Sequence, residues 1–291
     1  KSTVTAETGK RLERTVKLNL DPKFKKGQKV TLDFDVASNP EFLREGSALE
    51  DFMNPDRIVI GVQSRKAEQI LREIYKPLKA RVVVTNVATA EMIKHASNSF
   101  LATKISFINS VAQICDRVGA DVEKVAEGMG YDKRIGRSFL NAGVGYGGSC
   151  FPKDVDAFVR LAEKSGYDFQ ILKSVRKVNE EQKKAFIQMV EDKLWILKDK
   201  KIAVWGLAFK ANTDDIRSAA SMDIIAALEN EGAEIQAYDP KAMDHVKHVL
   251  PCVKCCKDFY AAAKGADCLL LLTEWDEFGK ADFKKVRDGM R

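Results

Sequence analysis

The longest regular pattern in the sequence is helical, runs over residues 89–118 and ends at Gly119. Apolar side chains keep helical spacings along it, namely Met92, Ile93, Ala96, Phe100, Ile105, Ile108, Val111, Ala112 and Cys115. At ~1.5 Å per residue such a helix would be about 45 Å long. Helices of this length usually link domains or pack against a partner copy. We therefore expect one long central helix.

The composition bounds the class of protein. The 291 residues predict about two domains, and 45% hydrophobic with 31% charged residues is typical of a globular protein. No run of 18 apolar residues is present, so we expect no membrane span. The net charge of +6 suits an anionic small ligand, but the dispersed lysines disfavour nucleic acid. Six cysteines without a secretory pattern indicate reduced thiols and a cytoplasmic location.

Short apolar strands alternate with helices on both sides of the long helix. Strands are expected at 30–36 and 57–61, followed by a helix that Ser64 caps. After the long helix, strands are expected at 202–206, 235–238 and 268–272. This alternation predicts parallel sheets of the α/β class.

The two sheets differ in what they can bind. A doubly wound unit normally opens with a strand and a glycine-rich phosphate turn, and no such turn precedes Lys1. We therefore expect the chain to begin inside a domain whose first half is absent. The turn at 206–210 lacks the G-x-G-x-x-G pattern, so a dinucleotide pyrophosphate is not expected there in the usual way.

Residues 144–154, Val-Gly-Tyr-Gly-Gly-Ser-Cys-Phe-Pro-Lys-Asp, point to a catalytic thiol. Three glycines allow the backbone a close approach to a ligand, and Pro152 is typical of a first helical turn. Cys150 is thereby expected just outside a helix N-terminus, where unpaired N–H groups favour the thiolate. The alternative is a small buried cysteine beside a glycine turn.

Other polar residues could assist this thiol. Lys94 and Asn98 share a helix face and could stabilise an oxyanion, or could belong to a solvated face. Asn39-Pro40 is typical of a helix start, which would place Glu41 and Glu45 one turn apart. These acids, and Asp154 after the thiol, are candidate general bases, or simply charges that complement helix dipoles.

A His/Cys cluster lies near the C-terminus. It comprises His245, His248, Cys252, Cys255 and Cys256. His-x-x-His and Cys-x-x-Cys spacings can bind zinc. Because Pro251 interrupts the segment and the cluster is far in sequence from Cys150, we favour surface or half-buried residues and no metal.

The sequence resembles the UDP-glucose/GDP-mannose dehydrogenase family over nearly its whole length. The matching blocks are residues 145–154, 39–46, 93–100, 134–136, 206–210 and 214–217, with Lys1-Ser2-Thr3-Val4 at the start. The resemblance implies three parts: the remainder of a Rossmann-like NAD-binding domain (1–84), a central helical dimerisation and catalytic domain (85–199), and a Rossmann-like UDP-sugar-binding domain (200–291).

The resemblance also implies an activity. It is NAD-dependent oxidation of UDP-glucose to UDP-glucuronate, in which Cys150 forms a thiohemiacetal and then a thioester, in a homodimer built on the helix 89–118. Lys94 and Asn98 would stabilise oxyanions, and Asp154, Glu41 and Thr3 would position water. The implied nucleotide-sugar contacts are Phe42, Leu43, Arg134, Phe139, Leu140, Asn141, Gly143, Gly147, Phe209 and Lys210. The implied cofactor contacts are Ser2, Glu45, Lys153 and Arg217.

Two alternatives stay open at the level of sequence. The substrate could be GDP-mannose or a UDP-N-acetyl hexosamine, because residue spacing does not decode the loops that select base and sugar. The chain could also be a non-catalytic, dimerising fragment that binds a sugar nucleotide.

Overall fold

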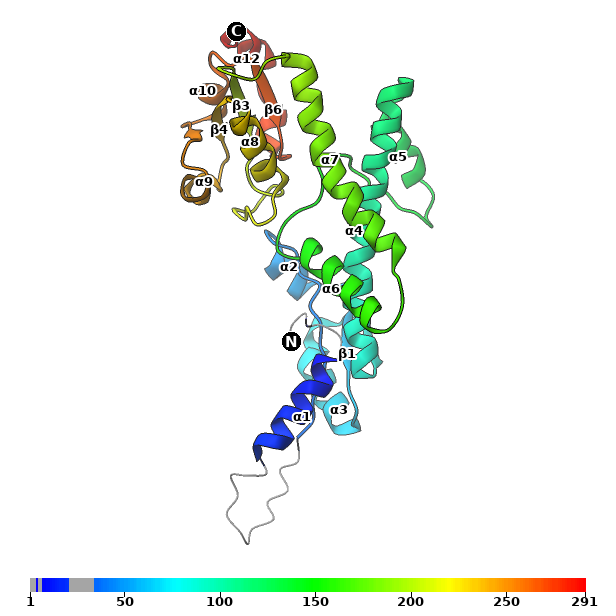
Figure 1. The fold of residues 1–291 in the computed structure, drawn as a ribbon. Coiled ribbons are helices and arrows are strands. Elements are labelled where there is room, and N and C mark those ends of the chain that lie inside the picture. Colours follow the sequence, from blue (N-terminus) through cyan, green and yellow to red (C-terminus); the bar gives the residue numbers. More distant parts are fainter. Residues whose placement is uncertain (1–3, 5–6, 21–33) are drawn as a thin grey trace. The chain divides into compact units, whose positions relative to one another are not determined.

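The computed structural model describes residues 4, 7–20 and 34–291 (Figure 1). The chain divides into two compact units. Unit 1 comprises residues 1–98 and 157–168, and unit 2 comprises residues 99–156 and 169–291. The expected strand at 30–36 lies partly outside the described residues, and residues 34–36 form no strand.

Unit 1 contains a small parallel sheet. Its elements are α1 (Thr8–Leu20), α2 (Ala48–Met53), β1 (Ile58–Gly61), α3 (Arg65–Tyr75), the 3₁₀ helix η2 (Lys76–Leu78) and β2 (Val82–Thr85). β1 and β2 pair in parallel, and Ile58, Ile60 and Tyr75 form the core beside them. The predicted strand at 57–61 is confirmed. So is the cap of α3, where Ser64 Oγ accepts a hydrogen bond from the Ala67 N–H at 3.1 Å.

The predicted helix start at Asn39-Pro40 is wrong. Residues 39–44 are irregular, and α2 begins only at Ala48. The Asn39 side chain does not cap a helix: its Nδ2 donates to the Val59 carbonyl at 2.7 Å, and its Oδ1 accepts from the Tyr75 hydroxyl. Asn39 thus ties the segment to β1 and α3, and Glu41 and Glu45 are not one helical turn apart.

The predicted long helix is confirmed as α4 (Val87–Val118), which supplies residues to both units. Gly119 ends it with φ +73°, a conformation that glycine adopts without a Cβ penalty. Three more helices follow: α5 (Val122–Gly130), α6 (Phe151–Lys164) and α7 (Gln170–Leu194). Asp121 caps α5 by accepting from the N–H groups of Glu123 and Lys124.

The C-terminal part of unit 2 is a four-stranded parallel sheet of order β5-β4-β3-β6 (Figure 1). The strands are β3 (Lys201–Trp205), β4 (Glu234–Tyr238), β5 (Lys254–Cys255) and β6 (Cys268–Leu271). The helices are α8 (Ala220–Asn230), α9 (Met243–Val249), α10 (Phe259–Ala263), α11 (Asp276–Gly279) and α12 (Phe283–Gly289). The expected strands at 202–206, 235–238 and 268–272 are confirmed, whereas the short β5 was not predicted.

Alternation along β3 explains why helices cover both faces of this sheet. Ile202 and Val204 pack in the cluster that includes α8 and α9, and Ala203 and Trp205 pack in the cluster that includes α10, α11 and α12. Successive side chains of a strand point to opposite faces, so both faces of this apolar strand are buried. The predicted α/β class is confirmed, with parallel strands and a long central helix.

Two further predictions concern organisation and location. The three-part division at residues 84 and 199 stays a prediction, and so does the cytoplasmic location. Within the described part of the chain, no helix combines the length and the apolar character that a membrane crossing needs. All six cysteines, which all lie in this part, are free thiols.

Candidate active site

Cys150 lies at the start of α6, as the sequence predicts. Its carbonyl accepts the first helical hydrogen bond, from the Asp154 N–H at 2.9 Å. The Cys150 side chain is half-buried, and Ser149 Oγ lies 3.6 Å from its sulfur. The N–H groups at a helix start favour negative charge on a nearby group.

The loop before the thiol packs directly on the C-terminal sheet domain. We call residues 143–150 the thiol loop. A Cβ at Gly147 would lie 2.3 Å from the Ser218 carbonyl oxygen, and one at Gly148 would lie 2.7 Å from the Phe209 ring. The Gly148 N–H donates to the Arg217 carbonyl at 2.9 Å. Phe209, which is predicted to bind the nucleotide sugar, therefore lies against Gly148, the neighbour of the predicted Gly147.

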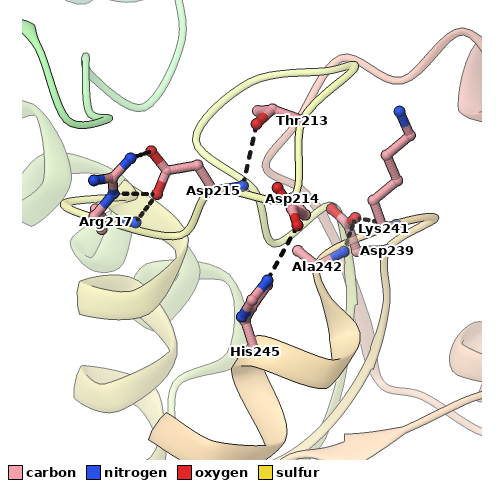
Figure 2. A network of polar contacts seen from close by, with 8 residues as sticks. All are labelled: Thr213, Asp214, Asp215, Arg217, Asp239, Lys241, Ala242 and His245. Atoms are coloured by element: carbon pink, nitrogen blue, oxygen red, sulfur yellow. Dashed lines mark hydrogen bonds and ion pairs between the residues drawn. The ribbon is translucent and has the colours of Figure 1, made fainter. Parts of the chain in front are cut away.

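The segment after β3 holds Arg217 in place (Figure 2). Asp215 accepts from Arg217 Nε at 2.9 Å and from Nη2 at 2.8 Å, a bidentate pair that fixes the guanidinium plane. The Arg217 side chain is still largely exposed. Its predicted contact with the cofactor stays a prediction.

Asp239 is the buried centre of the same region (Figure 2). It is 0% exposed and follows β4 directly. Its carboxylate accepts five hydrogen bonds, from the backbone N–H groups of Leu207, Ala208, Lys241 and Ala242 and from the Trp275 indole N–H. A buried charge is tolerated only when it is hydrogen-bonded in this way. Asp239 thus sets the backbone of the turn that leads to Phe209 and Lys210.

An aromatic group flanks the thiol. The Phe151 ring lies 6.1 Å from the Phe139 ring and 6.2 Å from the Tyr146 ring, measured between centroids. Phe139 has φ +64°. Leu140 points into the core with Ile108, so only its backbone could meet a ligand.

Lys94 and Asn98 are buried in unit 1, which excludes the solvated-face alternative. Lys94 is 4% exposed and Asn98 is 6% exposed. Lys94 Nζ lies 3.4 Å from Glu41 Oε1 and 5.3 Å from the centroid of the Phe42 ring. Arg57 stacks on the same ring at 3.8 Å. The structure therefore brings Lys94 together with Glu41 and Phe42, and Asn98 is buried one turn further along the same helix.

The other predicted residues have simpler surroundings. Asp154 is buried, and its Oδ1 lies 3.5 Å from Nζ of the exposed Lys153. Arg134 is exposed and pairs with Asp132 at 2.6 Å. Asn141 accepts from Arg137, and Leu43 donates its N–H to Glu41. Ser2 and Thr3 lie outside the described residues. The approach of Cys150 to Lys94 and Asn98, which belong to different units, stays a prediction.

The His/Cys cluster shows no metal geometry in the described ranges. His245 Nε2 lies 3.1 Å from Asp214 Oδ2 (Figure 2), and no group of three His, Cys, Asp or Glu residues there could hold an ion. Burial raises the pKa of the Cys255 and Cys256 thiols, which disfavours the thiolates that zinc needs.

Three side-chain amides near the thiol were missed from the sequence. Asn109 on α4 and Asn179 and Gln182 on α7 hydrogen-bond the backbone of the thiol loop. Asn109 and Asn179 are buried within helices. The only available signal in the sequence was a polar residue at a helix position that faces the core. This signal does not tell which group the side chain hydrogen-bonds.

Comparison with known proteins decides the family. Residues 1–79, 88–181 and 203–291 match the NAD binding domain, the central domain and the UDP binding domain of the UDP-glucose/GDP-mannose dehydrogenase family. A solved UDP-glucose dehydrogenase from Pyrobaculum islandicum superposes with a TM-score of 0.91 at 39% identity, covering 100% of this chain and 68% of that one. The chain belongs to the UDP-glucose/GDP-mannose dehydrogenase family.

Relatives within the family are similar over nearly all of this chain. A UDP-glucose 6-dehydrogenase of Bacillus subtilis (strain 168) is 48% identical over 99% of the chain, which spans 61% of that relative. Another from Pseudomonas aeruginosa is 44% identical over 100% of the chain, which spans 65% of that relative. A solved UDP-D-ManNAc dehydrogenase from Pyrococcus horikoshii is 26% identical with a TM-score of 0.82, covering 99% of this chain and 65% of that one.

The family model indicates NAD as the cofactor. Strands β1 and β2 form a parallel sheet. In doubly wound folds, dinucleotides bind at the carboxyl ends of such strands. At that end, a Cβ on Gly61 would meet the Ala90 Cβ at 2.5 Å, so this glycine serves helix packing and does not open a phosphate cradle. Gly61 is the last residue of β1, and no glycine follows β1 or β2 directly in the described residues.

The hydroxyl of Tyr146 in the thiol loop should lose its proton only at unusually high pH. Burial, aided by the charges of Asp156 and Glu180, raises its pKa from 10.0 to about 12. Because the neutral form is favoured in the folded state, its contribution to stability should be complete below pH 10.0 and lost as the pH rises through about 12. The difference between the phenolate absorbance titrations of wild type and Tyr146→Phe measures this pKa. A difference curve centred near pH 10 would contradict the burial argument.

Proposed function

We propose that this chain carries out, as part of an NAD-dependent dehydrogenase, the four-electron oxidation of UDP-glucose to UDP-glucuronate. The observation that carries the proposal is Cys150 at the start of α6, on a loop packed against the UDP binding domain. Proteins named UDP-glucose 6-dehydrogenase share 48% and 44% of its residues, whereas the UDP-D-ManNAc dehydrogenase shares 26%. This difference favours glucose over an N-acetyl hexosamine.

Cys150 supplies the covalent part of the chemistry. The C6 alcohol is first oxidised to an aldehyde, and the thiolate then bonds to the aldehyde carbon to give a thiohemiacetal. Oxidation of this adduct gives a thioester, which water cleaves to the carboxylate and the free thiol. NAD, when bound, would supply the hydride acceptor for both oxidations. A thiol that keeps the aldehyde bound prevents its release between the two oxidations.

Lys94 and Asn98 stabilise the negative oxygen of these intermediates. A buried ammonium beside a buried amide acts strongly on a developing charge, because water does not screen it. Glu41, which lies 3.4 Å from Lys94, and Asp154, one turn after Cys150, position or activate water together with Thr3. Each role is proposed from the resemblance and from these local surroundings.

The remaining predicted residues bind the two ligands. The nucleotide sugar contacts Phe42, Leu43, Arg134, Phe139, Leu140 (through its backbone), Asn141, Gly143, Gly147, Phe209 and Lys210. The cofactor contacts Ser2, Glu45, Lys153 and Arg217. Arg134, whose side chain is 89% accessible, is exposed enough to meet the nucleotide sugar as predicted.

The thiol can be tested by removing it. Cys150→Ala should abolish formation of the carboxylate, because the thioester requires the sulfur, and the product should be measured by mass spectrometry together with NADH absorbance. The matched control is Cys252→Ala, which removes an exposed cysteine and should keep normal turnover. Normal carboxylate formation in Cys150→Ala would defeat the mechanism.

The same assay tests the substrate. With UDP-glucose, the enzyme should form two NADH per sugar oxidised. Its kcat/KM for UDP-glucose should exceed that for GDP-mannose and for UDP-N-acetyl hexosamines. Preference for another sugar nucleotide would overturn the glucose assignment. Binding of UDP-glucose without any NADH would support the non-catalytic alternative.

Lys94 should act in the transition state more than in binding. Lys94→Met keeps the length of the side chain but removes the charge, so kcat should fall roughly 10²–10³-fold while the Kd of UDP-glucose changes little. Single-turnover kinetics and calorimetry measure the two quantities, and a melting curve checks folding. Equal losses in kcat and binding would reduce Lys94 to a docking residue.

We further propose that α4 forms a homodimer interface. Phe100, Phe107 and Ile114 follow one another at intervals of seven residues, and each side chain is more than half exposed. Seven residues are close to two helical turns, so the three share one face. Val118, 70% exposed, ends the helix with another apolar side chain. An apolar stripe of this kind is typical of a helix that packs against a partner copy.

A charge in the stripe should separate the subunits. Phe107→Glu should give a monomer in sedimentation equilibrium, because burying the carboxylate against an apolar partner face is unfavourable. Phe283→Glu, at a similarly exposed position on α12, is the matched control and should keep the dimer. A dimeric Phe107→Glu variant would place the interface elsewhere.

A further inference from the structure

The backbone of the thiol loop is held by the side-chain amide of Asn179. The Tyr146 N–H donates to Asn179 Oδ1 at 2.7 Å, and Asn179 Nδ2 donates to the Tyr146 carbonyl at 3.0 Å. Asn179 lies on α7 and is 5% exposed. One amide thus pairs with both polar groups of one loop residue, as a neighbouring β-strand would.

Gly145 lets the loop approach Asn179 this closely. A Cβ at Gly145 would lie 2.9 Å from Asn179 Oδ1, and Gly145 has φ +115°, which side-chain-bearing residues rarely adopt. The glycine before Tyr146 and the amide on α7 therefore form one fitted contact.

A second set of hydrogen bonds holds the loop three residues before Tyr146. The Gly143 N–H donates to Asn109 Oδ1 at 2.8 Å, and the Gly143 carbonyl accepts from Gln182 Nε2 at 2.8 Å. Gln182 is in turn oriented by Gln113 Nε2, which donates to its Oε1 at 2.7 Å. Amides of α4 and α7 thus fix the start of the loop, while the bond from Gly148 to the Arg217 carbonyl fixes its end.

We propose that Asn179 is a positioning residue for the Cys150 sulfur: it fixes the loop whose last residue carries the thiol. Tyr146 is four residues before Cys150. A change in backbone conformation at Tyr146 therefore alters the orientation of the Cys150 side chain. An amide suits this position because it offers an acceptor to the Tyr146 N–H and a donor to the Tyr146 carbonyl at the same time. The inference rests on the proposed function only for the effect on turnover, because thiol reactivity is measured without substrate.

Asn179→Ala removes both bonds. Iodoacetamide should then alkylate Cys150 about tenfold more slowly, measured for each cysteine by peptide mass spectrometry, because the thiolate loses its fixed place at the start of α6. The exposed Cys252 is the internal reference and should react at the wild-type rate. In the same variant, kcat should fall about tenfold or more while the Kd of UDP-glucose stays within a few-fold.

Asn179→Asp separates positioning from folding. The replacement keeps the acceptor for the Tyr146 N–H but sets an oxygen against the Tyr146 carbonyl, so Cys150 should again react slowly at neutral pH. Protonation of the new carboxyl restores a donor, so the ratio of the variant's Cys150 alkylation rate to that of wild type should rise towards one as the pH falls. A merely structural role would not produce this recovery.

The matched control is Gln188→Ala on the same helix, whose amide donates only to the exposed Asp192 among the hydrogen bonds of the described residues. It should change neither the Cys150 rate nor kcat. An unchanged or faster Cys150 rate in Asn179→Ala would overturn the inference. So would alkylation of the buried Cys115 in step with a lowered melting temperature, because that result would mean general loosening. Normal turnover in Cys150→Ala would instead defeat the proposed function and leave the effect of Asn179 on the thiol standing.

Discussion

The close approach of two glycines to the C-terminal domain is the constraint on which the site in unit 2 depends. Any side chain at Gly147 would overlap the Ser218 backbone, and one at Gly148 would overlap the Phe209 ring. Backbone and ring do not give way as the tip of a flexible side chain does. Because neither glycine has a Cβ atom, the loop that carries the thiol can pack against the turn of the UDP binding domain.

Both sides of this contact are built on buried polar groups. On the sheet side, Asp239 gathers backbone N–H groups from the segments after β3 and β4 and so sets the path towards Phe209. On the loop side, amides from α4 and α7 pair with the backbone at Gly143 and Tyr146. Buried polar groups in low-dielectric surroundings must be satisfied, which makes each arrangement specific. Chemistry that needs a defined thiol direction benefits from such rigidity.

Prediction from sequence succeeded where the signal was local. The period of apolar residues located α4, Ser64 located the start of α3, and Pro152 with the preceding glycines located α6 and Cys150. The prediction failed at Asn39-Pro40, although the local pattern there favours a helix start. There the Asn39 amide bonds to β1 and to Tyr75, partners 20 and 36 residues away, and these long-range bonds override the local preference. The two-residue β5 was too short to leave a periodic signal.

The sequence by itself determined the α/β class, the long helix and the presence of a thiol at a helix start, because periodicity, caps and glycines act within a few residues. Its order of motifs was also sufficient to place the chain in its family. Only the tertiary structure decided that Lys94 and Asn98 are buried and that Lys94 lies beside Glu41. It alone identified Asn179, which reaches Tyr146 across 33 residues. Such pairings depend on how helices pack, and packing between distant segments leaves no local pattern in the sequence.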